Sequence, residues 1–132
     1  MRVAGIMSGT SLDGVDVAIV DIQARGEALT VETVATHGEP YSEDVRSALL
    51  AVSNCATHTR DVARLHFLLP QLYAQAFHEC CRKAGIDPGG VELTGSHGQT
   101  IYHEGTPAPV LGRKVASTLG RAVTAFHLGA PF

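Results

Sequence analysis

The chain opens with the stretch RVAGIMSGTSLDGVDVAIVDI, residues 2–22. Two short apolar runs in this stretch flank a polar loop, residues 8–14, which carries two glycines, three hydroxyl side chains and one acid. β-Prone residues on both sides of a tight polar loop predict a β-hairpin with the loop at its tip. Small side chains let backbone N–H groups approach an anion closely, so the loop is a candidate phosphate site.

Two interpretations of this loop remain open from the residues alone. The loop lacks the lysine and the following helix of a P-loop, and it does not match GxGxxG. In a phosphate-binding loop, Asp13 and Asp16 could hold a hydrated Mg²⁺. In an ordinary hairpin, Asp13-Gly14 is a favoured turn dipeptide and Asp13 makes an Asx-turn.

Composition narrows the class of protein. The chain has 132 residues and a net charge of −3, which suits one domain without a basic surface for nucleic acid. No apolar run approaches the roughly 20 residues that span a bilayer, and Gly5 interrupts the N-terminal apolar run too early for a signal peptide. We therefore expect a cytoplasmic protein that binds neither nucleic acid nor membrane. The three cysteines, an odd number with one adjacent pair, predict no disulfide framework.

Periodicity predicts an α/β order of elements. Ser42 is a good N-cap, Gly85 is a natural helix end, and Pro70 should kink or split the long helix between them. Consecutive strands with short turns make an antiparallel meander, and a helical crossover then adds a parallel strand. The expected strands are residues 2–7, 15–23, 29–36 and 91–94, and the expected helices are residues 42–53 and 59–84.

Two strings in the chain resemble motifs of one enzyme family. MSGTSLDGVD, residues 7–16, resembles the first phosphate motif of the anhydro-N-acetylmuramic acid kinases, members of the sugar kinase, heat-shock protein 70 and actin superfamily. TGSHGQT, residues 94–100, resembles the sugar-side GSHGQT motif of the same family. The resemblance implies an incomplete ribonuclease-H-like (actin-like ATPase) domain over residues 1–119, followed by a divergent tail over residues 120–132.

The resemblance also implies the site and its cofactors, ATP and Mg²⁺. Asp13 would contact the metal, and the full-length parent could form a homodimer. The residues implied to bind the anhydro amino sugar are Ser96, His97, Gln99 and Thr100. The residues implied to bind the ATP phosphates are Gly9, Thr10, Ser11, Leu12, Asp13, Gly14, Val15 and Asp16.

The chemistry implied by the family needs a further group. Water opens the internal ether of 1,6-anhydro-N-acetylmuramic acid, and the freed O6 takes the γ-phosphoryl group, with a carboxylate base to activate the water. In the family this base follows the GSHGQT motif, but the present chain departs from the family pattern after residue 119. We assign no catalytic base within it and expect the chain alone to be inactive. A non-catalytic remnant that binds phosphate or a partner is the alternative, and another sugar kinase of the superfamily is a weaker one.

The end of the chain has its own pattern. Val115, Leu119, Ala122 and Phe126 recur at helical spacing. This spacing predicts a poorly docked terminal helix, and its apolar face predicts a tendency to self-associate.

Overall fold

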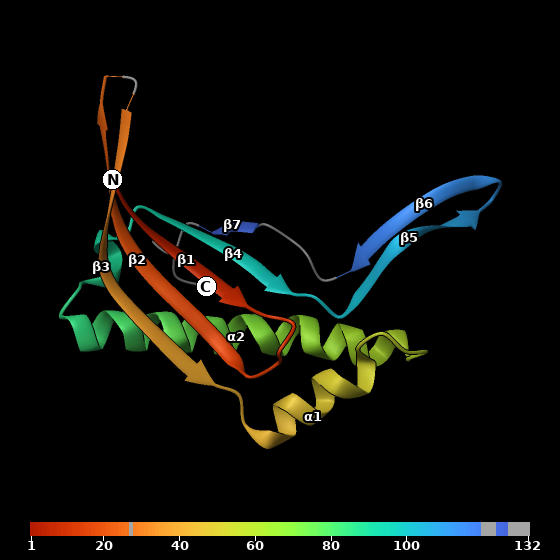
Figure 1. Cartoon of the computed structure of the whole chain (residues 1–132). Coiled ribbons are helices and arrows are strands. Elements are labelled where there is room, and N and C mark those ends of the chain that lie inside the picture. The colour runs from red at the N-terminus through yellow and green to blue at the C-terminus, as the bar shows by residue number, and fades with distance from the viewer. Residues whose placement is uncertain (27, 120–123, 127–132) are drawn as a thin grey trace.

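The computed structural model of the protein describes residues 1–26, 28–119 and 124–126. The described part is a mixed α/β structure with two sheets, two α-helices and one short 3₁₀ helix (Figure 1). In chain order the elements are β1 (Arg2–Ser8), β2 (Gly14–Arg25), β3 (Ala28–Pro40), α1 (Glu43–Val52), α2 (Thr59–Ala84), η1 (Pro88–Gly90), β4 (Leu93–Gln99), β5 (Tyr102–Val110), β6 (Arg113–Leu119) and β7 (Thr124–Phe126).

The larger sheet has the strand order β3-β2-β1-β4-β7. β1, β2 and β3 follow one another in the chain and pair antiparallel. β4 pairs with β1 in parallel, and α1 and α2 form the long connection that a parallel pair requires. These pairings confirm the predicted meander with an added parallel strand. The short strand β7 then pairs antiparallel with the outer side of β4.

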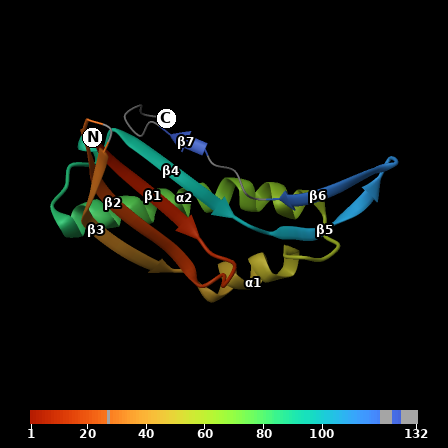
Figure 2. The same ribbon diagram turned by 45° about the horizontal axis from the view of Figure 1, so that its top comes forward.

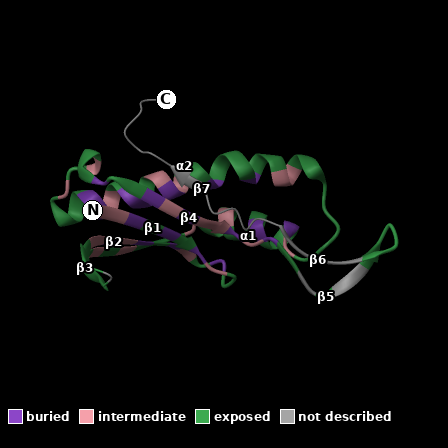
Figure 3. Ribbon diagram, turned by 90° about the horizontal axis from the view of Figure 1, so that it is seen from above, coloured by how far each residue is buried: buried purple, intermediate pink, exposed green. Residues whose placement is uncertain are grey.

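The core lies between this sheet and the helices. α2 runs across β1, β2 and β3 on one face of the sheet (Figure 2). Along β1, buried and more exposed residues alternate (Figure 3), and the buried ones are Ala4, Ile6 and Ser8. The buried apolar residues form one cluster, made of Ala4, Ile6, Leu12, Val15, Val17, Ile19, Leu49, Val52, Leu65, Leu69, Tyr73, Ala76, Phe77, Cys80, Cys81, Val91 and Ile101.

The helices begin and end close to the predicted residues. The Ser42 side chain accepts a hydrogen bond from the Val45 N–H and so caps α1. α2 ends at Gly85, whose φ of +67° is the left-handed conformation that favours glycine. α2 is not divided at Pro70, because this residue lies on the exposed side, where water can solvate the carbonyl left without a donor. Among the described residues, no helix is both long and apolar enough to cross a membrane.

The strand predicted over residues 91–94 is wrong in its bounds. β4 extends to Gln99, so Gly95, Ser96, His97 and Gln99 lie within a strand rather than in the loop after it. The reason is tertiary: β1 provides a ladder partner for each of these positions up to Ser96, and pairing outweighs the weak strand preference of glycine and polar residues.

The predicted terminal helix is also wrong. Val115 and Leu119 lie in β6, and Phe126 lies in β7, whereas Ala122 falls outside the described residues. β6 pairs antiparallel with β5 in a separate two-stranded sheet. The turn between them places two consecutive residues at positive φ, Leu111 at +48° and Gly112 at +77°. Such a turn suits the twist of a hairpin, and the resulting ladder overrides the helical spacing.

Candidate functional site

The loop between β1 and β2 and the end of β4 meet at one edge of the sheet. β1 and β4 are parallel neighbours, and Ser8 at the end of β1 is the ladder partner of Gln99 at the end of β4. The carboxyl ends of neighbouring parallel strands are where open α/β sheets bind ligands. The two predicted motifs, about ninety residues apart in the chain, are therefore adjacent in space.

Hydrogen bonds join the two motifs directly. The Ser8 hydroxyl lies 2.5 Å from Gln99 Oε1, and both side chains are buried. Gln99 Nε2 donates to the carbonyl oxygens of Gly9, at 3.0 Å, and Thr100, at 3.2 Å. The amide of Gln99 thus bridges the loop after β1 and the segment after β4.

Tyr41, just after β3, holds the other side of the loop. Its hydroxyl lies 2.8 Å from Ser8 Oγ, and its backbone N–H donates to the Asp13 carbonyl at 3.0 Å. The carbonyl oxygen of Gly14 lies 3.0 Å from the Ser8 hydroxyl. The carbonyls of Gly9, Asp13 and Gly14 are therefore all turned toward the protein body.

The remaining backbone of the loop suits an anion. In the part of the chain that the structure describes, the N–H groups of Thr10 and Ser11 donate to no protein acceptor. Leu12 adopts a left-handed φ of +56°, a conformation that places successive N–H groups around a concavity. Its side chain and that of Val15 are buried in the core, so these two residues can offer a ligand only their backbone. The buried Leu12 side chain stabilises the strained loop.

Asp13 lies exposed at the tip of the loop. The Ser11 hydroxyl donates to its carboxylate at 2.7 Å. This hydrogen bond, followed by the N–H groups of residues 13 and 14, lowers the pKa of Asp13, so the side chain is a carboxylate at neutral pH. No group of three or more metal-ligating side chains occurs among the described residues. One carboxylate fits Mg²⁺, which usually takes its other ligands from water and phosphate oxygens.

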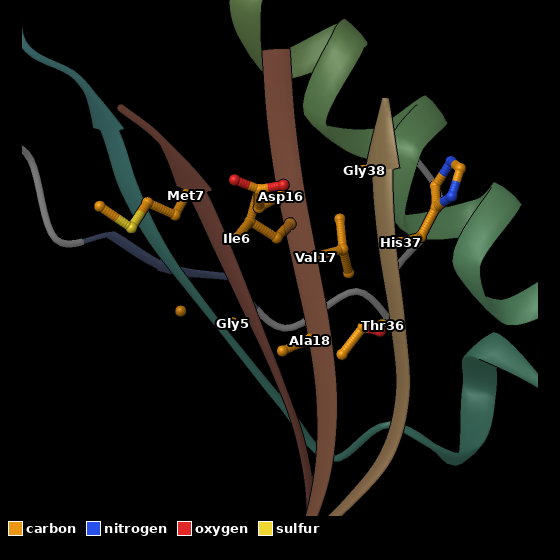
Figure 4. A pocket seen from close by; sticks show the side chains of 10 residues that line it. Gly5, Ile6, Met7, Asp16, Val17, Ala18, Thr36, His37 and Gly38 are labelled. Carbon is orange, nitrogen blue, oxygen red and sulfur yellow. The ribbon is translucent and has the colours of Figure 1, made fainter. Parts of the chain in front are cut away.

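Asp16 closely follows this loop, in β2, and is exposed on the sheet face opposite α2. It borders an open groove of about 740 Å³, together with Met7, Gly38 and Gly5 (Figure 4). Met7 and Asp16 form the last pair of the β1–β2 ladder before the loop. His37 also lines the groove, but its ring points toward the helices.

The sugar-side motif presents a mixture of donors and acceptors. His97 is half-buried, and its Nδ1 lies 3.1 Å from the Gly98 carbonyl oxygen. A carbonyl only accepts, so Nδ1 carries the proton and Nε2 is the atom that a ligand can meet. Ser96 is buried and its hydroxyl accepts from the Gly98 N–H at 3.3 Å. Thr100 follows the end of β4 and is partly exposed.

Two residues of this arrangement were not predicted as site residues: Ser8, which lies within the first motif, and Tyr41, which lies outside both motifs. Ser8 had a usable signal, because it is a polar residue at the inward position of a strand whose other inward residues are Ala4 and Ile6. Tyr41 had none, since its position beside Ser8 depends on how β3 ends against β2.

Comparison with known proteins identifies the family. Residues 1–117 match the anhydro-N-acetylmuramic acid kinase family, and the chain belongs to it. The kinase of Caldanaerobacter subterraneus is 41% identical over 118 residues, which covers 89% of this chain and 30% of that protein. The kinase of a Cyanothece species is 41% identical over 134 residues, covering 99% and 33%, and that of Salinibacter ruber is 38% identical over 133 residues, covering 98% and 34%. The chain spans about a third of the length of the curated relatives it matches.

Proposed function

We propose that this segment belongs to an ATP-dependent kinase of the cytoplasm that opens 1,6-anhydro-N-acetylmuramic acid with water and phosphorylates its O6. The product is N-acetylmuramic acid 6-phosphate, which places the enzyme in peptidoglycan recycling. Membership of the kinase family supports the class of reaction. The segment would then be the N-terminal, ribonuclease-H-like part of the enzyme, and the full-length protein could form a homodimer.

One observation carries the proposal beyond family membership. Gln99, in the motif proposed for the sugar, donates a hydrogen bond to the carbonyl of Gly9, in the loop proposed for ATP. Phosphoryl transfer requires mainly that donor and acceptor be positioned in line and that charge be neutralised. A buried side chain that joins the two proposed substrate motifs supports such positioning.

The proposed roles follow from the geometry of each residue. The N–H groups of Gly9, Thr10 and Ser11, with the backbone of Leu12, Gly14 and Val15, would bind ATP phosphates. Asp13 would hold Mg²⁺, which neutralises charge on the phosphates when it is bound. Asp16, on the neighbouring pair of the ladder, would contribute charge near the loop. Ser96, His97 and Thr100 would bind hydroxyl and amide groups of the sugar, and the role of Gln99 is taken up below.

The test is turnover by a full-length kinase that carries this N-terminal sequence. ATP, Mg²⁺ and the anhydro sugar are supplied, and the 6-phosphate product is measured by mass spectrometry together with ADP. We expect product from the full-length protein and at least about 10²–10⁴-fold less from the 132-residue chain, to which we assign no catalytic base. ATP binding without product would instead support a non-catalytic protein. Product from a different sugar would support another kinase of the superfamily.

A further inference from the structure

We propose that Gln99 is a positioning residue for the ATP loop, acting with Ser8 and Tyr41, and that it is not a ligand of the sugar. This inference rests on the proposed kinase function. It assigns Gln99, a residue of the sugar-side motif, to the binding of ATP. It follows from the hydrogen bonds that the polar atoms of these three side chains donate and accept.

The amide of Gln99 has no N–H left for a ligand. Its two N–H groups donate to the carbonyls of Gly9 and Thr100, which can only accept, so Nε2 and Oε1 are placed without ambiguity. Oε1 therefore faces Ser8, at 2.5 Å. The side chain is 3% exposed, so a sugar would reach it only by displacing the loop.

The proton of Ser8 then has a defined direction. A serine hydroxyl has one proton, and carbonyl oxygens only accept, so Ser8 is the donor both to Gln99 Oε1, at 2.5 Å, and to the Gly14 carbonyl, at 3.0 Å. The Tyr41 hydroxyl, 2.8 Å away, must then donate to Ser8. The result is a one-way chain from Tyr41 through Ser8 to Gln99, ending at the Gly9 carbonyl. Buried hydrogen bonds in such a chain polarise and strengthen one another.

The residues at the two ends of this hydrogen-bond chain, Gln99 and Tyr41, each bind one end of the loop between β1 and β2. Gln99 holds the carbonyl of Gly9, and Tyr41 holds the carbonyl of Asp13 through its backbone N–H. The N–H groups between these anchors are the ones proposed to meet phosphate. Loss of this hydrogen-bond chain should therefore weaken the binding of the ATP phosphates. The proposed contacts of Ser96 and His97 with the sugar should remain in place.

A second tyrosine offers a matched control. The Tyr73 hydroxyl is buried on α2 next to Tyr41 but has no hydrogen-bond partner among the described residues. Burial raises the pKa of both tyrosines, and the neighbouring Tyr41 adds to the rise at Tyr73. Removing either hydroxyl takes one oxygen from the same part of the core. Among the described residues, the Tyr41 hydroxyl has a hydrogen-bond partner at 2.8 Å, Ser8, whereas the Tyr73 hydroxyl lies near Tyr41 and Ser8 without such a partner.

The experiment measures KM for ATP, KM for the sugar and kcat in the full-length kinase. We expect Tyr41→Phe to raise the KM for ATP about threefold and Gln99→Met about tenfold, with the KM for the sugar unchanged. Tyr73→Phe should change none of the three constants. A selective rise in the KM for the sugar with Gln99→Met would overturn the inference and restore Gln99 as a sugar ligand. Should Gln99→Met fail to fold, Tyr41→Phe carries the test alone.

A double-mutant cycle separates a connected chain from independent packing effects. Because Ser8 is the partner within hydrogen-bond distance of the Tyr41 hydroxyl among the described residues, Tyr41→Phe should add almost nothing in a Ser8→Ala background. If the effects of the two substitutions on the KM for ATP were fully additive, they would contradict a connected hydrogen-bond chain. The proposed function is tested separately, by turnover of the wild-type enzyme. If the wild-type enzyme does not phosphorylate the anhydro sugar, the same variants are compared by equilibrium binding of Mg-ATP. Equal affinities of all variants for Mg-ATP would refute the inference.

Discussion

Gly14→Ala should destabilise the protein through a backbone clash at the start of β2. An alanine Cβ at this position would fall on the carbonyl oxygen of Glu39 and lie 3.0 Å from Pro40 Cα. Neither neighbour yields easily, because Gly14 and Pro40 are ladder partners and the proline ring fixes its own φ. The next residue, Tyr41, is held to the Asp13 carbonyl.

The size of the effect can be worked out from these contacts. Overpacking a rigid site costs about 1–3 kcal/mol, and a clash with backbone on both sides belongs near 2–3 kcal/mol. Unfolding entropy is about 2.1 cal/mol/K per residue, or about 0.28 kcal/mol/K for this chain, so the melting temperature should fall by about 7–11 °C.

The assay is thermal denaturation of the 132-residue chain, followed by circular dichroism. Gly5→Ala is the matched control, because Gly5 also lies in a strand of the sheet and its Cβ would meet no heavy atom within 4 Å among the described residues. Alanine should leave that site unchanged or slightly more stable. A Gly14→Ala protein that melts within about 2 °C of the Gly5→Ala protein would refute the reasoning.

Three further changes test the core, the surface charges and the loop. Phe77→Ala empties a fully buried position and should cost about 3–5 kcal/mol in urea denaturation, whereas the exposed Phe67→Ala on the same helix should cost less than about 0.5 kcal/mol; equal losses would contradict the packing. Arg82 lowers the pKa of Glu79 from 4.5 to about 2, so the stabilisation by this pair is complete above pH 4.5 and is lost as the pH falls toward 2. Glu79→Gln should therefore lower the urea midpoint at pH 7 and match the wild type near pH 2, and a difference that persists at pH 2 would exclude this cause. Asp13→Asn in the full-length kinase should reduce kcat about 10²–10³-fold with an unchanged melting temperature, since asparagine also forms Asx-turns; an unchanged kcat would leave the loop as a turn only.

The sequence predicted the elements whose signals are local. The apolar stripe of α2 and its glycine end gave that helix its correct bounds, Thr59–Ala84, and the Ser42 cap set the start of α1. The hairpin of β1 and β2 and the order of the meander also followed from local patterns. In these cases the residues near each boundary supply its stabilising contacts.

Elements that depend on a distant partner were predicted with wrong bounds or as the wrong type. The motif Gly95–Gln99 reads as a loop because glycine and polar residues have weak strand preference, yet β1 draws it into the sheet. Val115 and Leu119 read as one helix face, although β5 pairs with them as a strand. The site was predicted to the same extent. The loop residues were named from their motif, but the hydrogen bonds of Ser8 and Tyr41 to this loop form only in the folded sheet.

The parallel pair of β1 and β4 also has a consequence for folding. β1, β2 and β3 are joined by short turns and can assemble as soon as residues 1–40 are available. Gln99, by contrast, reaches Gly9 across a separation of 90 residues, and closing so long a loop costs entropy and slows folding. We therefore expect the β1–β2 hairpin to form before β4 joins the sheet, and its loop to become fixed only when the helices have brought Gln99 back to Gly9.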